Sequence, residues 1–168
     1  MSPVISVTRR LTAFFVALLV SVVTDQVTKA WAIATLQDLP MQSYFGDTFR
    51  WTFTTNHGAF LSLGSGLPTQ ARFWVLTVAV GGLLLGLGVY ALVTKLLNAT
   101  TVAGYGFIVG GGASNWFDRL THDGGVVDFM NMGIGSLRTG VFNVADVAIL
   151  VGIGLILIGS PKAEPKAP

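Results

Sequence analysis

The sequence contains no cysteine, and only two of its 168 residues are histidine. The absence of cysteine excludes disulfide bonds and thiolate chemistry, and two histidines are too few for a histidine-rich metal centre. Charge is scarce as well, because 11% of the residues are charged where a soluble domain has about 25%. The net charge of +2 is spread along the chain, without a basic cluster that would indicate a nucleic-acid partner. We therefore expect no metal, no cofactor and no nucleic acid.

Hydrophobic residues make up 52% of the chain, and its mean hydropathy of +0.68 is typical of a membrane protein. About 20 predominantly apolar residues span a bilayer as a helix. The predicted spans cover residues 11–34, 73–93, 100–118 and 141–159. The third is rich in glycine, which lets helix backbones approach closely in lipid. The sequence thus predicts an all-α membrane protein with four transmembrane helices.

The first apolar run follows Arg9 and Arg10 and superficially resembles a secretory signal peptide. Asp25 and Lys29 interrupt the expected transition to a cleavage site, so an uncleaved first helix is the better interpretation. These two residues are spaced i,i+4 and share a helix face, where they can pair. Such a pair would anchor the helix end and orient nearby polar groups.

Residues 36–70 are too polar to span and are predicted to form a small β-like cap with a loop on the outer side. The alternation of aromatic and hydroxyl residues over Trp51–Thr54 predicts a strand, and Asn56–Gly58 carries a turn signal. The tail, residues 161–168, has three prolines and two lysines and is expected to be disordered. Residues 1–160 then form a single membrane domain.

Basic residues near the span ends predict the orientation. The positive-inside rule favours both termini and the short connector after the second span in the cytoplasm, with the two longer loops facing outward. The residues on the proposed cytoplasmic side are Arg9, Arg10, Lys95, Lys162 and Lys166, against Arg50, Arg72 and Arg138 on the other.

Two carboxylates, Asp128 in the short extended run Val126–Phe129 and Asp146 in the last apolar segment, lie beside strongly apolar sequence at the outer interface, where an unpaired acid is penalised. Asn143 is a candidate N-cap that places Asp146 in the first turn of the last helix. Two carboxylates brought close together share one proton, so one can act as base and the other as acid on an amide carbonyl. The residues alone leave other roles open: ion binding, a proton relay, a solvated Asp128, or an Asp146 that only caps its helix. Asp118 and Arg119 at the end of the third span are equally consistent with a helix end at the water boundary.

Five stretches of the chain, in order, resemble motifs of the lipoprotein signal peptidase (signal peptidase II) family, a family of bacterial inner-membrane aspartyl peptidases. They are Asp25–Lys29, Asn56–Ala59, Gly112–Arg119, Val126–Phe129 and Phe142–Asp146. Each stretch alone is a weak signal, whereas all of them in the family's order over most of the chain are specific.

The resemblance implies roles for individual residues. Asp128 and Asp146 match the catalytic dyad. The residues that match substrate-binding or supporting positions are Asn56, Gly58, Asn115, Asp118, Arg119, Asn143, Asp25 and Lys29. Ser114 replaces a glycine of the family pattern and is expected to reshape packing near Asn115. Phe60–Leu61 also departs from the pattern, which affects substrate contacts of that loop and leaves the dyad untouched.

The resemblance also implies an activity. Family members remove signal peptides from diacylglyceryl-modified prolipoproteins, cutting before the lipidated cysteine by water activation on the two aspartates. This chain is then expected to act as a monomer in the bacterial inner membrane, on lipidated prolipoproteins among membrane lipids, with its active site at the outer face. A proton-coupled transporter would instead place acids at mid-bilayer and repeat its halves, and the sequence has neither feature. A silent binder of lipidated peptides remains a rival, and a presenilin-like protease ranks lower because its aspartates lie in different motifs.

Overall fold

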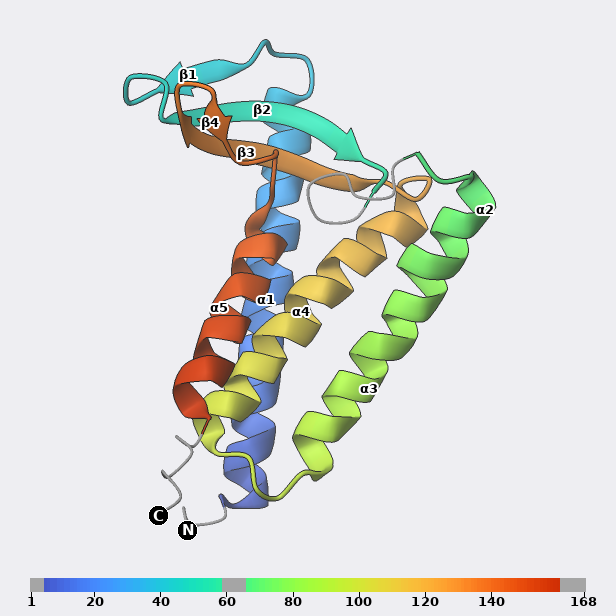
Figure 1. Cartoon of the computed structure of the whole chain (residues 1–168), viewed down its shortest axis with the longest axis vertical. Helices are drawn as coiled ribbons and strands as arrows, with labels where there is room; N and C mark the ends of the chain where they lie inside the picture. The colour runs from blue at the N-terminus through green and yellow to red at the C-terminus, as the bar shows by residue number, and fades with distance from the viewer. Residues whose placement is uncertain (1–4, 59–65, 161–168) are drawn as a thin grey trace, which may run out of the picture.

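The computed structural model describes residues 5–58 and 66–160. It is a bundle of helices with a small antiparallel sheet lying across one end, and the described part of the chain begins and ends at the opposite end (Figure 1). The prediction of a mostly helical chain with a small β part is confirmed. The helical elements are α1 (Val7–Leu36), α2 (Thr69–Arg72), η2 (Phe73–Ala79), α3 (Val80–Val93), α4 (Ala99–Thr121) and α5 (Val144–Gly159).

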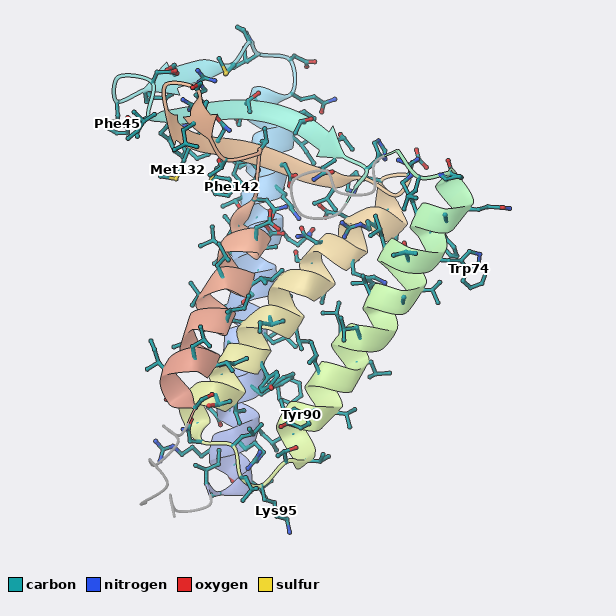
Figure 2. All side chains as sticks on the ribbon, viewed as in Figure 1. Phe45, Trp74, Tyr90, Lys95, Met132 and Phe142 are labelled. Atoms are coloured by element: carbon teal, nitrogen blue, oxygen red, sulfur yellow. The ribbon has the colours of Figure 1, made fainter. Side chains whose placement is uncertain are left out.

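Elements α2, η2 and α3 follow one another without a break, and η2 is a π-helical stretch within them. Among the described residues, two helical stretches, Val7–Leu36 and Thr69–Val93, are long and apolar enough to cross a membrane, and Val144–Gly159 is a shorter apolar helix. Large apolar side chains on these helices are exposed, including Leu19, Leu85 and Leu157. Figure 2 shows side chains standing out from the helices. An outer surface of this kind suits lipid better than water.

Helices α4 and α5 pack with their backbones in contact. A Cβ atom added to Gly104 would lie 2.7 Å from the carbonyl oxygen of Gly152, and one added to Gly152 would lie 2.5 Å from that of Gly104. Glycine at both positions is therefore needed for this close approach, as is common where helices associate in lipid. The glycine-rich α4 lies between α1, α3 and α5 in the bundle (Figure 1).

The sheet has the strand order β1-β2-β3-β4, with every neighbouring pair antiparallel. The strands are β1 (Gln42–Tyr44), β2 (Phe49–Asn56), β3 (Val126–Ile134) and β4 (Leu137–Arg138). The strand predicted at Trp51–Thr54 is confirmed within β2. The predicted cap was confined to residues 36–70, whereas half of the sheet comes from the segment between α4 and α5.

The first residues of β3, Val126–Phe129, fit the short extended run that the sequence indicates there, but its place in the sheet of the cap was not predicted, because these four residues are all buried. A strand covered on both faces shows no period-two alternation of apolar and polar residues. Val127 and Phe129 pack on the C-terminal end of α1, where they form a buried cluster with Ala32 and Leu36. Strand β3 therefore connects the sheet to the helices.

The start of the last helix also differs from the prediction, which set it at residue 141. Phe142 is extended and bridges to Met130 of β3, and α5 begins only at Val144. Asn143 has extended backbone angles and its side chain accepts the N–H of Asp146, so the predicted N-cap is confirmed. The predicted disordered tail, residues 161–168, lies outside the described residues.

Candidate active site

Asp128 lies on β3 opposite Thr54 of β2, and its side chain is almost fully buried. The Asn143 side-chain amide donates to Asp128 Oδ1 over 2.7 Å, and the Asn56 amide donates to Oδ2 over 3.1 Å. Asn56 ends β2 and also accepts the N–H of Gly58 through its Oδ1. The turn at the end of β2 thus orients an amide toward Asp128.

Asp146 lies in the first turn of α5. Its Oδ2 accepts the backbone N–H of Asn143 over 3.2 Å, and its Oδ1 accepts the side-chain amide of Asn115 over 3.1 Å. Together with the bond from the Asp146 N–H to Asn143 Oδ1, this forms a reciprocal capping box. Asn143 therefore contacts both candidate carboxylates, one through its side chain and one through its backbone.

Burial raises the pKa of Asp128 from 3.8 to about 7, with the negative charge of Asp146 contributing in the same direction. Hydrogen bonds from Asn56 and Asn143 and the charge of Lys29 lower the pKa but do not outweigh these effects. At neutral pH Asp128 therefore holds its proton for part of the time, next to a second carboxylate. Such an arrangement offers an acid and a base side by side.

A buried ammonium lies behind the two carboxylates. Lys29 Nζ is 2.7 Å from Asp25 Oδ2, 2.8 Å from Asp118 Oδ2 and 2.8 Å from Asn115 Oδ1. Its three donors thus have three acceptors, and the side chains of the two ion-pair partners are at most 2% exposed. The predicted pairing of Asp25 with Lys29 is confirmed, and Asp118 joins it from α4.

The cluster of Asp25, Lys29 and Asp118 also forms hydrogen bonds to the two elements that carry the candidate carboxylates. Asp25 Oδ1 accepts the N–H of Ala145 in α5 over 2.8 Å, and Asp118 Oδ2 accepts the N–H of Val127 in β3 over 3.1 Å. Both bonds end one residue away from Asp146 and Asp128. Asn115 completes the link, because its Oδ1 accepts from Lys29 and from Asn143 while its amide donates to Asp146.

Arg119 contacts the turn that follows β2, at the edge of the site. Its guanidinium donates to the carbonyl of Gly58 over 2.9 Å and to that of Asn115 over 3.2 Å. The structure therefore brings every predicted site residue into one connected network of hydrogen bonds. Its members are Asp25, Lys29, Asn56, Gly58, Asn115, Asp118, Arg119, Asp128, Asn143 and Asp146.

Two further side chains, which were not predicted as site residues, join this network. Gln26 donates to Asp118 Oδ1 and to Ser114 Oγ, both over 2.9 Å, and Ser114 Oγ donates to Asp25 Oδ2 over 2.7 Å. Ser114 thus adds a hydrogen bond to the cluster at the position where the family pattern has glycine. The signal for Gln26 was its amide within an apolar helix, which demands a polar partner.

An apolar groove of about 260 Å³ begins at Asp146 and continues along one face of α5 past Ile149, Leu150 and Ile153. Among the described residues, no group of three or more histidine, cysteine, aspartate or glutamate side chains is arranged to hold a metal ion. The site thus combines two neighbouring carboxylates with an apolar surface on the helix below one of them.

The fold and the site define a helical membrane protein with a buried carboxylate pair where its helices meet a small sheet. Residues 17–161 match the model of the family described as Signal peptidase (SPase) II. The chain belongs to the signal peptidase II family, a family of proteases.

Relatives and solved structures agree with this assignment. The chain is 34% identical over 155 residues to a lipoprotein signal peptidase of Gloeobacter violaceus, covering 92% of this chain and 85% of the relative. It is 37% identical over 157 residues to that of Nostoc punctiforme, covering 92% of both. A solved bacterial membrane enzyme has the same fold, with a TM-score of 0.72 at 24% identity over 85% of this chain and 84% of the other.

Proposed function

We propose that this chain is an aspartic endopeptidase that removes signal peptides from diacylglyceryl-modified prolipoproteins, cutting before the lipidated cysteine. Asp128 and Asp146 form its catalytic dyad. The observation that carries the proposal is the contact of one residue, Asn143, with both carboxylates. Family membership supports the substrate class.

The two aspartates divide the acid and base roles. Burial raises the pKa of Asp128 to about 7, so the proton shared by the pair resides on this residue near neutral pH. Asp146 lies in the first turn of α5, where the helix dipole favours the anion, and unlike Asp128 it accepts a backbone N–H as well as a side-chain amide. Asp146 is therefore the base and Asp128 the acid.

In the proposed reaction, ionised Asp146 takes a proton from a water molecule while that water attacks the scissile carbonyl carbon. Protonated Asp128 donates to the carbonyl oxygen, which gives a neutral tetrahedral diol. Asp146 then returns a proton to the leaving amine as the C–N bond breaks, and Asp128 recovers its proton as the new carboxyl group forms. Both aspartates end in their starting states, so no covalent intermediate is needed.

The remaining network residues position the dyad and the substrate. Asn115 and Asn143 orient the carboxylates, and the ion cluster around Lys29 holds α1, α4, α5 and β3 together. Arg119, Asn56 and Gly58 form the loop side that faces the substrate backbone. The apolar groove from Asp146 to Ile153 suits the hydrophobic part of a lipidated substrate.

The proposal includes an arrangement in the membrane. Four spans, provided by α1, the stretch Thr69–Val93, α4 and α5, cross the bacterial inner membrane, with both termini in the cytoplasm and the sheet on the outer face. The chain acts as a monomer and forms one domain over residues 1–160. The exposed apolar side chains of α1, α3 and α5 support this placement.

The test is cleavage of a diacylglyceryl-modified prolipoprotein by the purified chain, beside the same protein without lipid. Asp128→Asn and Asp146→Asn should each abolish cleavage. Asp38→Asn, which changes an exposed acid outside the network, should cleave like the parent. Turnover retained in either dyad variant would remove that residue from the dyad. A folded parent that binds the lipidated protein without cutting it would indicate a silent lipid-peptide binder.

A further inference from the structure

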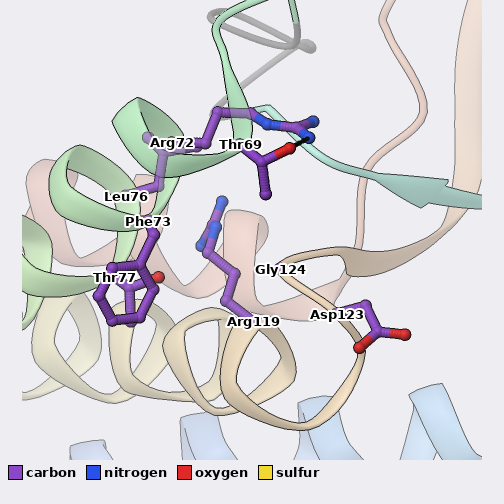
Figure 3. Close-up of a pocket in the computed structure, with 8 residues that line it drawn as sticks. All are labelled: Thr69, Arg72, Phe73, Leu76, Thr77, Arg119, Asp123 and Gly124. Carbon is purple, nitrogen blue, oxygen red and sulfur yellow. Dashed lines mark hydrogen bonds between the residues drawn. The ribbon is translucent and has the colours of Figure 1, made fainter.

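A second cavity, of about 300 Å³, lies between the start of the second helical stretch and the outer end of α4. Figure 3 shows Arg72 reaching over it from α2, while Arg119 extends from α4 toward the segment that carries Arg72. Its remaining lining includes Thr69, Phe73 and Asp123. The cavity contains none of the dyad residues, so it needs an explanation of its own.

The guanidinium groups of Arg72 and Arg119 have more N–H donors than there are acceptors among their described neighbours. Among the described residues neither arginine forms an ion pair, and Arg72 donates to the Thr69 hydroxyl over a long 3.4 Å. Arg119 Nε is buried and has no hydrogen-bond partner within the part of the chain that the structure describes. The charges of Asp128, Asp118 and Asp146 act on Arg119 without forming an ion pair with it. Residues 59–65, which are not described, contain no acidic residue. A buried cationic donor without an acceptor is costly and indicates a missing anionic ligand.

The charges of the lining residues favour a ligand with a small net negative charge. Arg72 and Arg119 contribute two positive charges and Asp123 one negative charge, so the lining carries +1 at neutral pH. A phosphodiester monoanion matches this value, and guanidinium groups bind its oxygens through paired N–H donors.

The position of the cavity along the bundle indicates that a phosphate bound there would come from a membrane lipid. The cavity lies at the sheet end of the bundle, where the outer headgroups meet the helices in the proposed arrangement (Figure 1). Trp74, two residues after Arg72, is exposed and points away from the bundle (Figure 2), as interfacial tryptophans do. The wall beside it is the π-helical stretch η2, and such stretches often occur at functional sites.

We propose that this cavity binds the phosphate of a phospholipid headgroup, held between Arg72 and Arg119. The threonine hydroxyls of Thr69 and Thr77 line the same space, and Phe73 and Leu76 provide an apolar wall for the glycerol and acyl carbons. Because Arg119 also donates to Gly58 beside the dyad, a bound lipid would border the loop side of the site. One membrane lipid would then be a specific ligand of the protein, in addition to the bulk lipid that surrounds it.

The test measures lipid binding to delipidated protein by native mass spectrometry, with phosphatidylglycerol and with diacylglycerol, which lacks the phosphate. The parent should retain phosphatidylglycerol in preference, and Arg72→Gln should weaken that binding about ten-fold or more. Arg9→Gln, an exposed arginine at the opposite end of the bundle, is the matched control and should bind like the parent. Arg72→Lys keeps the charge and should recover part of the affinity, which separates loss of the ligand from loss of the fold.

Equal binding by the parent and Arg72→Gln, or an equal loss in Arg9→Gln, would overturn the proposal. Displacement of the lipid by inorganic phosphate at matched concentration would assign the cavity to a free anion and overturn the lipid assignment. The dyad variant Asp128→Asn should bind phosphatidylglycerol normally, so the result does not depend on the proposed peptidase activity.

Discussion

Asn143 donates its side-chain amide to Asp128 Oδ1 over 2.7 Å from the position that caps α5. The oxygen of the same side chain accepts the N–H of Asp146, so one residue both starts the helix and holds a carboxylate on a neighbouring strand. A short side chain is enough to cap the helix, whereas the contact with Asp128 on the strand needs the longer asparagine amide. Substitution can therefore separate the two roles.

Asn143→Ser should keep the cap, because serine caps helices as well as asparagine does, while losing the contact with Asp128. Cleavage should fall about 100-fold or more, as on loss of one oriented donor in other active sites, and the melting temperature in detergent should change little. Asn143→Ala should lose both, with about 1 kcal/mol less stability from the missing cap. Equal activity of Asn143→Ser and the parent would show that the amide does not position the dyad.

Cleavage should decline as the pH rises through about 7, because Asp128 has a raised pKa of about 7 and must hold its proton to act as acid. The measurement is kcat/KM against pH on a lipidated prolipoprotein in one detergent. A rate that stays level from pH 6 to pH 9 would contradict the assignment of Asp128 as the acid.

The raised pKa of Asp128 should also make the stability of the protein depend on pH. Folding raises the pKa of Asp128 from 3.8 to about 7, so the folded state binds more protons than the unfolded state between these values. The free energy of unfolding must then fall as the pH rises through this window, by an amount on the order of 4 kcal/mol from this group. Asp128→Asn removes the titration, and its melting temperature relative to the parent should rise from pH 4 to pH 8. A constant difference would mean that Asp128 is not desolvated in the folded protein.

Lys29→Met should destabilise the protein strongly, because it leaves the carboxylates of Asp25 and Asp118 buried without a cation. Loss of one partner of a buried ion pair typically costs about 3–5 kcal/mol. Thermal unfolding in detergent measures the effect, and Lys95→Met at the opposite, exposed end of the bundle is the control. An unchanged melting temperature with lost cleavage would assign Lys29 a direct part in the reaction.

Gly152→Ala should loosen the contact of α4 with α5, since the new Cβ would lie 2.5 Å from the Gly104 carbonyl oxygen. Overpacking of this kind costs about 1–3 kcal/mol. Gly154→Ala is two residues further along the same helix, and a Cβ there meets nothing within 4 Å. The first variant should melt at a lower temperature than the parent and the second should not. Identical melting of the two variants would show that the helices can separate without loss of stability.

The sequence was informative where a local pattern sets the structure. Apolar runs predicted the helices, the alternation around Trp51 predicted part of β2, and Asn143 predicted the start of α5 more closely than the apolar run that begins at residue 141. The first four residues of β3 showed an extended run without alternation of apolar and polar residues, because all four are buried. The pairing of β3 with β2 joins residues between 70 (Asn56 with Val126) and 83 (Phe49 with Met132) positions apart, which no local signal encodes.

The candidate site followed from the resemblance residue by residue, but its connections did not. Neither spacing nor composition places Lys29 against Asn115, or the Asp25 carboxylate against the N–H of Ala145. Those contacts depend on how α1, α4 and α5 pack in three dimensions. Gln26 was overlooked for the same reason, because its partners Ser114 and Asp118 lie on another helix.

The capping box of α5 has a consequence for how this enzyme can fail. Because Asp146 completes the cap through its own carboxylate, the first turn of α5 and the proposed base form or fray together. A molecule whose last helix is unravelled at this end has no base held in position. If Asp146 is the base, as proposed, incompletely folded copies should not hydrolyse the peptide bonds of neighbouring proteins, because only the folded helix end holds the base in place.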